Sequence, residues 1–200
     1  MNDRSPEHIR PLLVRIDRLM AERERVLVAI DGGSASGKTT LGELLQNVYG
    51  CPIFRMDDFF LRPEQRTPER FSEPGGNVDR ERFLSEVLLP LREGKAVDYR
   101  RFDCKTFTIA SPRRIEPGRL NIVEGAYAMH PDLAPYYDLT VFLAVSAEKQ
   151  RERILKRNAP AQAELFFDRW IPFEQRYFAA LNVPERCDLT IFLDDQTSVP

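Results

Sequence analysis

Apolar runs of strand length alternate with helical segments along most of the chain. The runs at residues 26–30, 53–56, 121–123, 139–145 and 189–193 are mostly apolar, which is typical of strands buried on both faces of a sheet. The segments at residues 6–25, 38–49, 79–93, 147–157 and 162–181 are predicted to be helices, most of them with apolar side chains at three- and four-residue spacing. Strands that alternate with helices predict a parallel sheet with helices on both faces, which is a three-layer α/β domain.

Two stretches depart from this alternation. Residues 57–78 are polar and rich in proline and glycine, and residues 95–118 are predicted to form an irregular hairpin. Pro90 is expected to kink the helix at 79–93, and Pro172 to interrupt the helix at 162–181. We therefore expect one domain over residues 1–200, with an N-terminal helix (1–25), insertions at 57–118, and a small helical lid with its following helix at 147–181.

Composition narrows the class of protein. The chain has 200 residues, 42% of them hydrophobic, and 29 Lys and Arg against 31 Asp and Glu. The resulting net charge of −2 argues against general affinity for nucleic acid. No apolar run approaches the roughly 18 residues of a membrane span, and charges near the N-terminus argue against a signal peptide. A cytoplasmic protein without membrane association is expected, and the sequence is compatible with a homo-oligomer.

Cysteine and histidine usage gives no sign of a disulfide framework or a metal site. The three cysteines, Cys51, Cys104 and Cys187, are far apart and form no CxxC pair, which fits a reducing compartment. His8 and His130 are isolated and lack metal-ligand spacing, so we expect both at the surface.

A phosphate-binding loop follows the first predicted strand. The pattern G-x-x-x-x-G-K-[ST] is matched by Gly32, Gly33, Ser34, Ala35, Ser36, Gly37, Lys38 and Thr39. Thr40 directly follows the motif and is included in the candidate nucleotide site. Such a loop turns successive backbone N–H groups onto phosphate oxygens at the positive end of the next helix. Lys38 can reach the β- and γ-phosphates, and the Thr39 hydroxyl can ligate Mg²⁺. The sequence therefore predicts a P-loop NTPase fold that binds a nucleoside triphosphate.

Other nucleotide-binding classes lack their signatures in this chain. There is no Asn/Thr-Lys-x-Asp segment to bind guanine, no transporter signature, and Ser34 stands where a dinucleotide fingerprint needs its second glycine. Small-molecule kinases that use ATP and Mg²⁺ are the leading class that remains.

Carboxylates at strand ends supply the chemistry that a kinase needs. A base must take the proton of the accepting hydroxyl, and another carboxylate helps to hold Mg²⁺. Asp57 follows the second predicted strand and Glu124 the third, where ligands of open α/β sheets bind. Asp31 lies beside the loop and is given a minor role. Asp58 ranks below Asp57, because an extended strand would point it to the opposite side.

Cations and aromatic residues complete the candidate site. Arg153 and Arg157 are four residues apart, so they share a helix face and can neutralise a transferring phosphoryl group. Arg169 can join them from the far side of a lid. Six aromatic residues cluster in sequence near the expected acceptor pocket, and at least half are expected to be plain packing: Phe59, Phe60, Tyr99, Phe102, Phe107 and Tyr127.

These motifs, in this order, resemble uridine kinase and its relatives, which include phosphoribulokinase and bacterial pantothenate kinase. The resemblance runs over residues 26–193 and is carried by Gly32–Thr40, Met56–Phe60, Asn77–Asp79, Leu91–Gly94, Phe102-Asp103, Val123–Gly125, Phe142-Leu143 and Arg151–Arg157. It implies that Asp57 is the base, that Thr39 and Glu124 serve Mg²⁺, and that Arg153 and Arg157 are lid arginines over the phosphates.

The acceptor side departs from the uridine kinase pattern. Where uridine kinases carry an aspartate that grips the ribose hydroxyls, this chain has Glu73, followed by Pro74-Gly75-Gly76. Phe102 stands where they carry tyrosine, and the histidine that contacts the base is absent. By resemblance we expect transfer to a nucleoside hydroxyl, with Asp57, Glu73, Phe102, Glu124 and Arg169 toward the small-molecule acceptor. A pantothenate-like or sugar acceptor and a non-catalytic ATP-binding module remain as alternatives.

Overall fold

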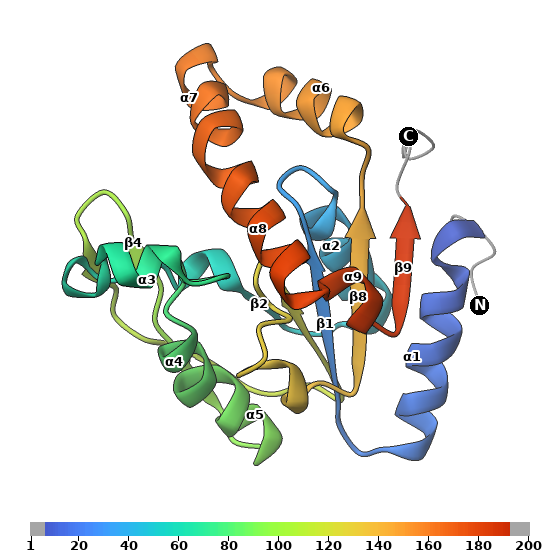
Figure 1. Ribbon diagram of the computed structural model, residues 1–200. Coiled ribbons are helices and arrows are strands. Elements are labelled where there is room, and N and C mark those ends of the chain that lie inside the picture. Colours follow the sequence, from blue (N-terminus) through green and yellow to red (C-terminus); the bar gives the residue numbers. More distant parts are fainter. Residues whose placement is uncertain (1–6, 193–200) are drawn as a thin grey trace.

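A five-stranded parallel sheet forms the centre of the molecule. The computed structural model describes residues 7–192 (Figure 1). The strands lie in the order β2-β7-β1-β8-β9. In chain order they are β1 (Val26–Gly32), β2 (Ile53–Arg55), β7 (Leu120–Glu124), β8 (Leu139–Ala144) and β9 (Leu189–Phe192). All four neighbouring pairs are parallel, so every strand ends at the same edge of the sheet.

Helices cover both faces of this sheet, which confirms the predicted three-layer α/β fold. On one face α1 (Arg10–Glu22) and α2 (Lys38–Tyr49) bury their apolar sides together with Val26, Val28 and Ile30. The opposite face packs Leu27 and Ala29 against the helices α4 (Arg80–Phe83), α5 (Leu89–Arg92), α8 (Ile171–Leu181) and α9 (Val183–Arg186). Alternate residues of β1 thus enter two separate cores, as the period of two in a strand requires.

Pro172 does not interrupt its helix as expected, and both helices change their hydrogen-bond pattern just before the internal proline. A π-helical turn at Leu84–Leu88 joins α4 to α5, and Pro90 follows two residues later. Likewise a π-helical turn at Phe166–Trp170 joins α7 (Pro160–Leu165) to α8, and Pro172 follows two residues later. Because proline cannot donate to the carbonyl four residues earlier, a change in hydrogen-bond pattern just before it lets the helix continue.

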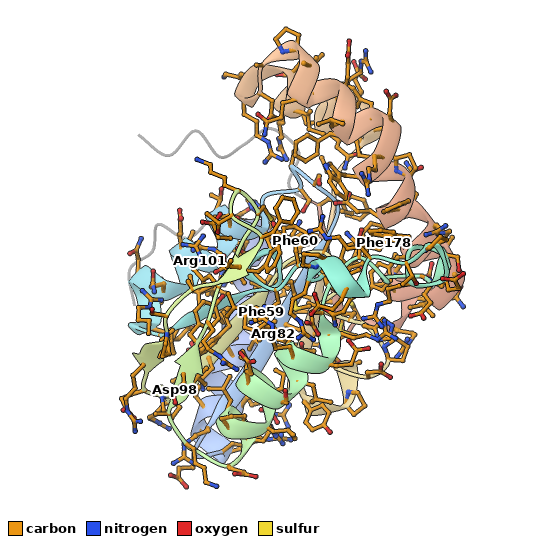
Figure 2. All side chains as sticks on the ribbon, turned by 90° about the vertical axis from the view of Figure 1, so that its left-hand side faces the viewer. Phe59, Phe60, Arg82, Asp98, Arg101 and Phe178 are labelled. Atoms are coloured by element: carbon orange, nitrogen blue, oxygen red, sulfur yellow. The ribbon has the colours of Figure 1, made fainter. Side chains whose placement is uncertain are left out.

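The insertions are built from short elements beside the sheet. They contain α3 (Pro68–Ser72) and two antiparallel pairs, β3 (Val97–Tyr99) with β6 (Arg113–Ile115) and β4 (Phe102–Asp103) with β5 (Thr108–Ile109). Figure 2 shows Arg82 against Phe59, and its guanidinium carbon lies 4.1 Å from the ring centre. This buried contact ties the helix α4 to the segment that follows β2.

The remaining helices form an arm above the carboxyl ends of the strands. The helix α6 (Ala147–Arg157) follows β8, and α7 leads through the π-helical turn back down α8 toward the sheet (Figure 1). Residue 6, where the first helix was expected to begin, and Leu193, at the end of the last predicted strand, lie outside the described residues. Within residues 7–192 no helix combines the length and the apolar character that a membrane span needs.

Candidate active site

The predicted phosphate loop lies between the central strand β1 and the helix α2. Gly32 has φ +148°, and a Cβ there would stand 2.5 Å from the Leu143 carbonyl oxygen, so only glycine fits. Gly37 caps α2 with φ +105°. The Lys38 ammonium donates to the carbonyl oxygens of Gly32 and Gly33, both at 2.8 Å. The loop therefore curls around its own lysine, with the N-terminus of α2 behind it.

The polar groups of this loop suit a bound polyphosphate. The Ser36 hydroxyl is fully buried and has no hydrogen-bond partner within residues 7–192. A buried polar group without a partner is costly, and the loop around it supplies backbone N–H donors at a helix N-terminus. This chemistry fits the triphosphate that the motif predicts.

Thr39 and Glu124 meet at the start of α2. The Thr39 hydroxyl donates to Glu124 Oε1 at 3.3 Å, and Arg55 Nε donates to the same oxygen at 2.9 Å. Burial raises the pKa of Glu124, while the charges of Lys38 and Arg55 lower it. A hydroxyl and a carboxylate are oxygen ligands of the kind that Mg²⁺ prefers. No group of three or more His, Cys, Asp or Glu in the described part of the chain could hold a metal alone, so phosphate or water would complete the shell.

Asp57 faces the same region from the end of β2. It lies in a 3₁₀ turn, Met56–Asp58, that follows this strand directly. Its carboxylate is exposed to the cleft, but the surrounding protein removes part of its hydration and raises its pKa. The charge of Lys38 opposes this shift and that of Asp58 adds to it. Asp57 is therefore electrostatically coupled to the P-loop lysine, as a base near the γ-phosphate would be.

Asp58 is held by partners on the insertions. It accepts from the Tyr99 hydroxyl and from Arg101 Nε, each at 2.7 Å. Because β2 ends at Arg55, the alternation of a strand does not separate the two aspartates as expected. The 3₁₀ turn and these two partners do so instead.

Cations of the arm cover the cleft. A cavity of about 790 Å³ is lined by Lys38, Asp57 and Glu124 from below and by Arg153 and Arg157 from α6. Arg153 donates to the Ala35 carbonyl oxygen at 3.2 Å. Arg157 lies over the Phe166 ring at 5.2 Å and lowers the pKa of Asp57 through its charge. The structure thus brings the predicted lysine, base, magnesium ligands and two lid arginines to one cleft.

Three predicted acceptor residues do not line this cavity. Glu73 pairs with Arg80 at 2.9 Å and with Arg70 at 3.6 Å. Phe102 is buried edge-on to the exposed Phe107, and the Arg66 guanidinium lies over both rings. The side chain of Arg169 stacks among the rings of Phe71, Trp170 and Phe173. Their predicted roles toward an acceptor stay predictions.

Two residues of α8 contact the P-loop or the residue before it, and neither was predicted from the sequence. Glu174 accepts hydrogen bonds from Ser34, and the Tyr177 hydroxyl donates at 2.8 Å to Asp31, which directly precedes the loop. Asp31 is fully buried, and burial raises its pKa to about 6. An acid on an amphipathic helix is normally expected on the solvated face, so the sequence carried no signal for Glu174.

The expectation that His130 lies at the surface was wrong. His130 lies in the loop that follows β7, its side chain is buried, and burial lowers its pKa to about 4. Its Nδ1 accepts the Asp132 N–H at 3.2 Å, so this histidine stabilises a turn.

Comparison with known proteins places this site in a family. A profile of the phosphoribulokinase/uridine kinase family matches residues 27–161, which include the P-loop, Asp57, Glu124 and both arginines predicted for the lid. The chain belongs to this family. The resemblance seen in the motifs is therefore confirmed.

Two relatives are kinases or kinase-like proteins, but their names give different substrates. Uridine kinase-like protein 4 from Arabidopsis thaliana is 28% identical over 68% of this chain and 31% of that protein. The bifunctional α-galactosidase/sucrose kinase AgaSK from Mediterraneibacter gnavus is 30% identical over 76% of this chain and 18% of that protein. The chain thus spans less than a third of either relative.

A solved structure shares the fold. A protein from Silicibacter sp. TM1040, described provisionally as a fructose transport system kinase, superposes with a TM-score of 0.70 at 22% identity. The match covers 93% of this chain and 99% of that one, so the fold extends over nearly the whole chain.

Proposed function

We propose that the protein transfers the γ-phosphate of ATP to a hydroxyl group of a small molecule. The observation that carries this proposal is the position of Asp57, an exposed carboxylate coupled to Lys38 in the same cleft as the P-loop. A phosphoryl-transfer site needs a base beside the γ-phosphate, and a strand-end carboxylate opposite the P-loop lysine meets that need. Family membership supports the same reaction class.

Each residue of the cleft has a distinct task in this reaction. Lys38 binds the β- and γ-phosphates, and Asp57 accepts the proton of the attacking hydroxyl at its carboxylate. Thr39 and Glu124 would hold Mg²⁺, which when bound neutralises charge on the phosphate oxygens. Arg153 and Arg157 keep their charge at any physiological pH and offset the charge that develops on the transferring group.

A non-catalytic ATP-binding module is the weaker alternative. A switch needs the P-loop and magnesium ligands but has no use for a base at the γ-phosphate. Asp58 next door is held by Tyr99 and Arg101, whereas Asp57 accepts none of the hydrogen bonds found among residues 7–192. The unengaged carboxylate favours the kinase.

For the acceptor we propose a nucleoside first and a sugar second. The nucleoside follows from the uridine kinase-like motifs. The ion pairs of Glu73 with Arg70 and Arg80 already neutralise the predicted ribose-gripping carboxylate, which weakens the case for a nucleoside. A relative that carries a sucrose kinase supports the sugar. The insertions at 57–118 would form the acceptor-binding part, and residues 147–181 the lid with its following helix.

A phosphorylation screen with Mg²⁺ and ATP over nucleosides, sugars and vitamins tests the proposal. A site that lacks the ribose-gripping aspartate and the base-contacting histidine should act weakly on uridine, because hydroxyls of the substrate then lack partners. A kcat/KM of about 10⁵ M⁻¹s⁻¹ or more for uridine or cytidine would instead establish a uridine kinase. ATP binding without transfer to any acceptor would favour the switch.

A further inference from the structure

A carboxylate from the arm occupies hydrogen-bond donors of the P-loop. Glu174 lies in the first turn of α8 and is 5% exposed. Its Oε2 accepts the Ser34 N–H at 2.9 Å, and its Oε1 accepts the Ser34 hydroxyl at 2.6 Å. From α6, Gln150 Nε2 donates to the Ser34 carbonyl oxygen at 2.8 Å. Ser34 is therefore held on all its polar groups by the arm.

This contact lies in the cleft where the terminal phosphate is expected. Glu174 lines the same cavity as Lys38 and Asp57, and the charges of both residues act on its carboxyl. Lys38 serves the β- and γ-phosphates and Asp57 the transferred group, so the Glu174 carboxylate stands beside the place of the γ-phosphate. Burial raises the pKa of Glu174, which means that its ionised form is costly there.

We propose that Glu174 competes with the γ-phosphate for Ser34 and so sets the affinity and selectivity for the triphosphate. This inference rests on the proposed function, because it concerns the nucleotide of the same site. A phosphate oxygen and a carboxylate compete for the same N–H donor, and two negative charges at close range repel strongly in a partly desolvated cleft. Triphosphate binding therefore displaces Glu174 from Ser34 and breaks this contact between α8 and the P-loop.

The test compares the binding of two nucleotides to a variant in which the charge of Glu174 is removed. Glu174→Gln keeps the size and an acceptor oxygen but removes the charge. Glu164→Gln removes the same charge from the exposed face of α7 and serves as the matched control. Dissociation constants are measured by calorimetry for Mg-ADP and for a magnesium complex of an ATP analogue with a methylene bridge between the β- and γ-phosphates.

We expect Glu174→Gln to bind the triphosphate analogue about tenfold or more tightly, because the repulsive charge is removed and the remaining amide oxygen is a weaker acceptor for Ser34. Its affinity for ADP should change less than threefold, and Glu164→Gln should stay within twofold of wild type for both nucleotides. Should Glu174→Gln fail to fold, Ser34→Ala removes the 2.6 Å bond alone and is expected to tighten analogue binding about threefold.

Unchanged or weaker binding of the analogue by Glu174→Gln would overturn the inference, as would an equal gain for ADP and the analogue. Glu174 would then merely shape the loop. In either case a wild-type protein that binds the analogue leaves the proposed function intact. Binding of neither nucleotide by wild type or variant would overturn both.

Discussion

The phosphate end and the acceptor end of this molecule are built in different ways. The P-loop extends a strand whose seven residues are all buried, and most of the donors that it offers to a phosphate are backbone N–H groups at a helix N-terminus. The acceptor region depends on side chains carried by insertions, where β4 and β5 have only two residues each. A backbone site is encoded by a short local motif, whereas a side-chain site depends on how distant loops pack. The phosphate site can therefore be predicted from a single sequence, whereas the acceptor site cannot.

Lys38→Ala tests the phosphate end most severely. The ammonium is the cation that the loop itself wraps, through two carbonyl contacts at 2.8 Å. Its removal should abolish turnover, with a loss of at least about a thousandfold in kcat/KM. Lys95→Ala, on an exposed lysine paired with Glu93, is the control and should retain wild-type activity. Activity of Lys38→Ala within tenfold of wild type would mean that the P-loop is not the catalytic site.

Asp57→Asn tests the place where the phosphate end and the acceptor end meet, since the proposed base lies between the γ-phosphate and the acceptor hydroxyl. The amide cannot accept the hydroxyl proton, so phosphoryl transfer should fall by about 10²–10⁴-fold while ATP binding is kept. The neighbouring Asp58→Asn is the matched control, since Asp58 is held by Tyr99 and Arg101, and its loss in kcat should stay below about tenfold. A reversed ranking in single-turnover rates would move the base to Asp58.

The same contrast explains how far the sequence could be interpreted. The helix at 38–49 was predicted with its observed bounds, because a P-loop fixes its start and Gly50 its end. The strand-end positions of Asp57 and Glu124 followed from the strand pattern alone. Glu174 could not be found, because its partner Ser34 lies 140 residues away and an acid on a helix predicts a solvated face. The packing of Arg169, which was expected to join the lid arginines and face the acceptor, could not be found either, because its aromatic neighbour Phe71 comes from the insertions.

The pH dependence of kcat sharpens the assignment of the base. Asp57 must be ionised to accept a proton, and its pKa is raised above the ordinary 3.8. Activity should therefore fall as pH drops through that raised pKa, with log kcat losing about one unit per pH unit on this limb. The residual activity of Asp57→Asn should lack the limb. If the limb persists in this variant, the titrating group is another carboxylate of the cleft, such as Glu124.

Asp31→Asn should have the smallest effect on phosphoryl transfer. Asp31 directly precedes the P-loop, and its role is in the stability of the folded protein. Its carboxylate accepts from the N–H groups of Gly32 and Met129 and from the Tyr177 hydroxyl. Burial nevertheless raises its pKa from 3.8 to about 6. The folded state therefore resists ionisation of this group more than the unfolded state does. The stability it contributes is fully present below pH 3.8 and is lost as pH rises through about 6.

This sign gives a measurable difference between wild type and variant. Between pH 4.5 and 7, denaturant unfolding of wild type should lose about 2 kcal/mol relative to Asp31→Asn, which cannot ionise. The subtraction also removes the opposite trend of His130, since both proteins carry it. Asp98→Asn, on the exposed residue of β3 in Figure 2, is the control and should show no such relative change. A relative change of the opposite sign would mean that the three donors, with Lys38, outweigh burial and keep Asp31 ionised at the back of the phosphate loop.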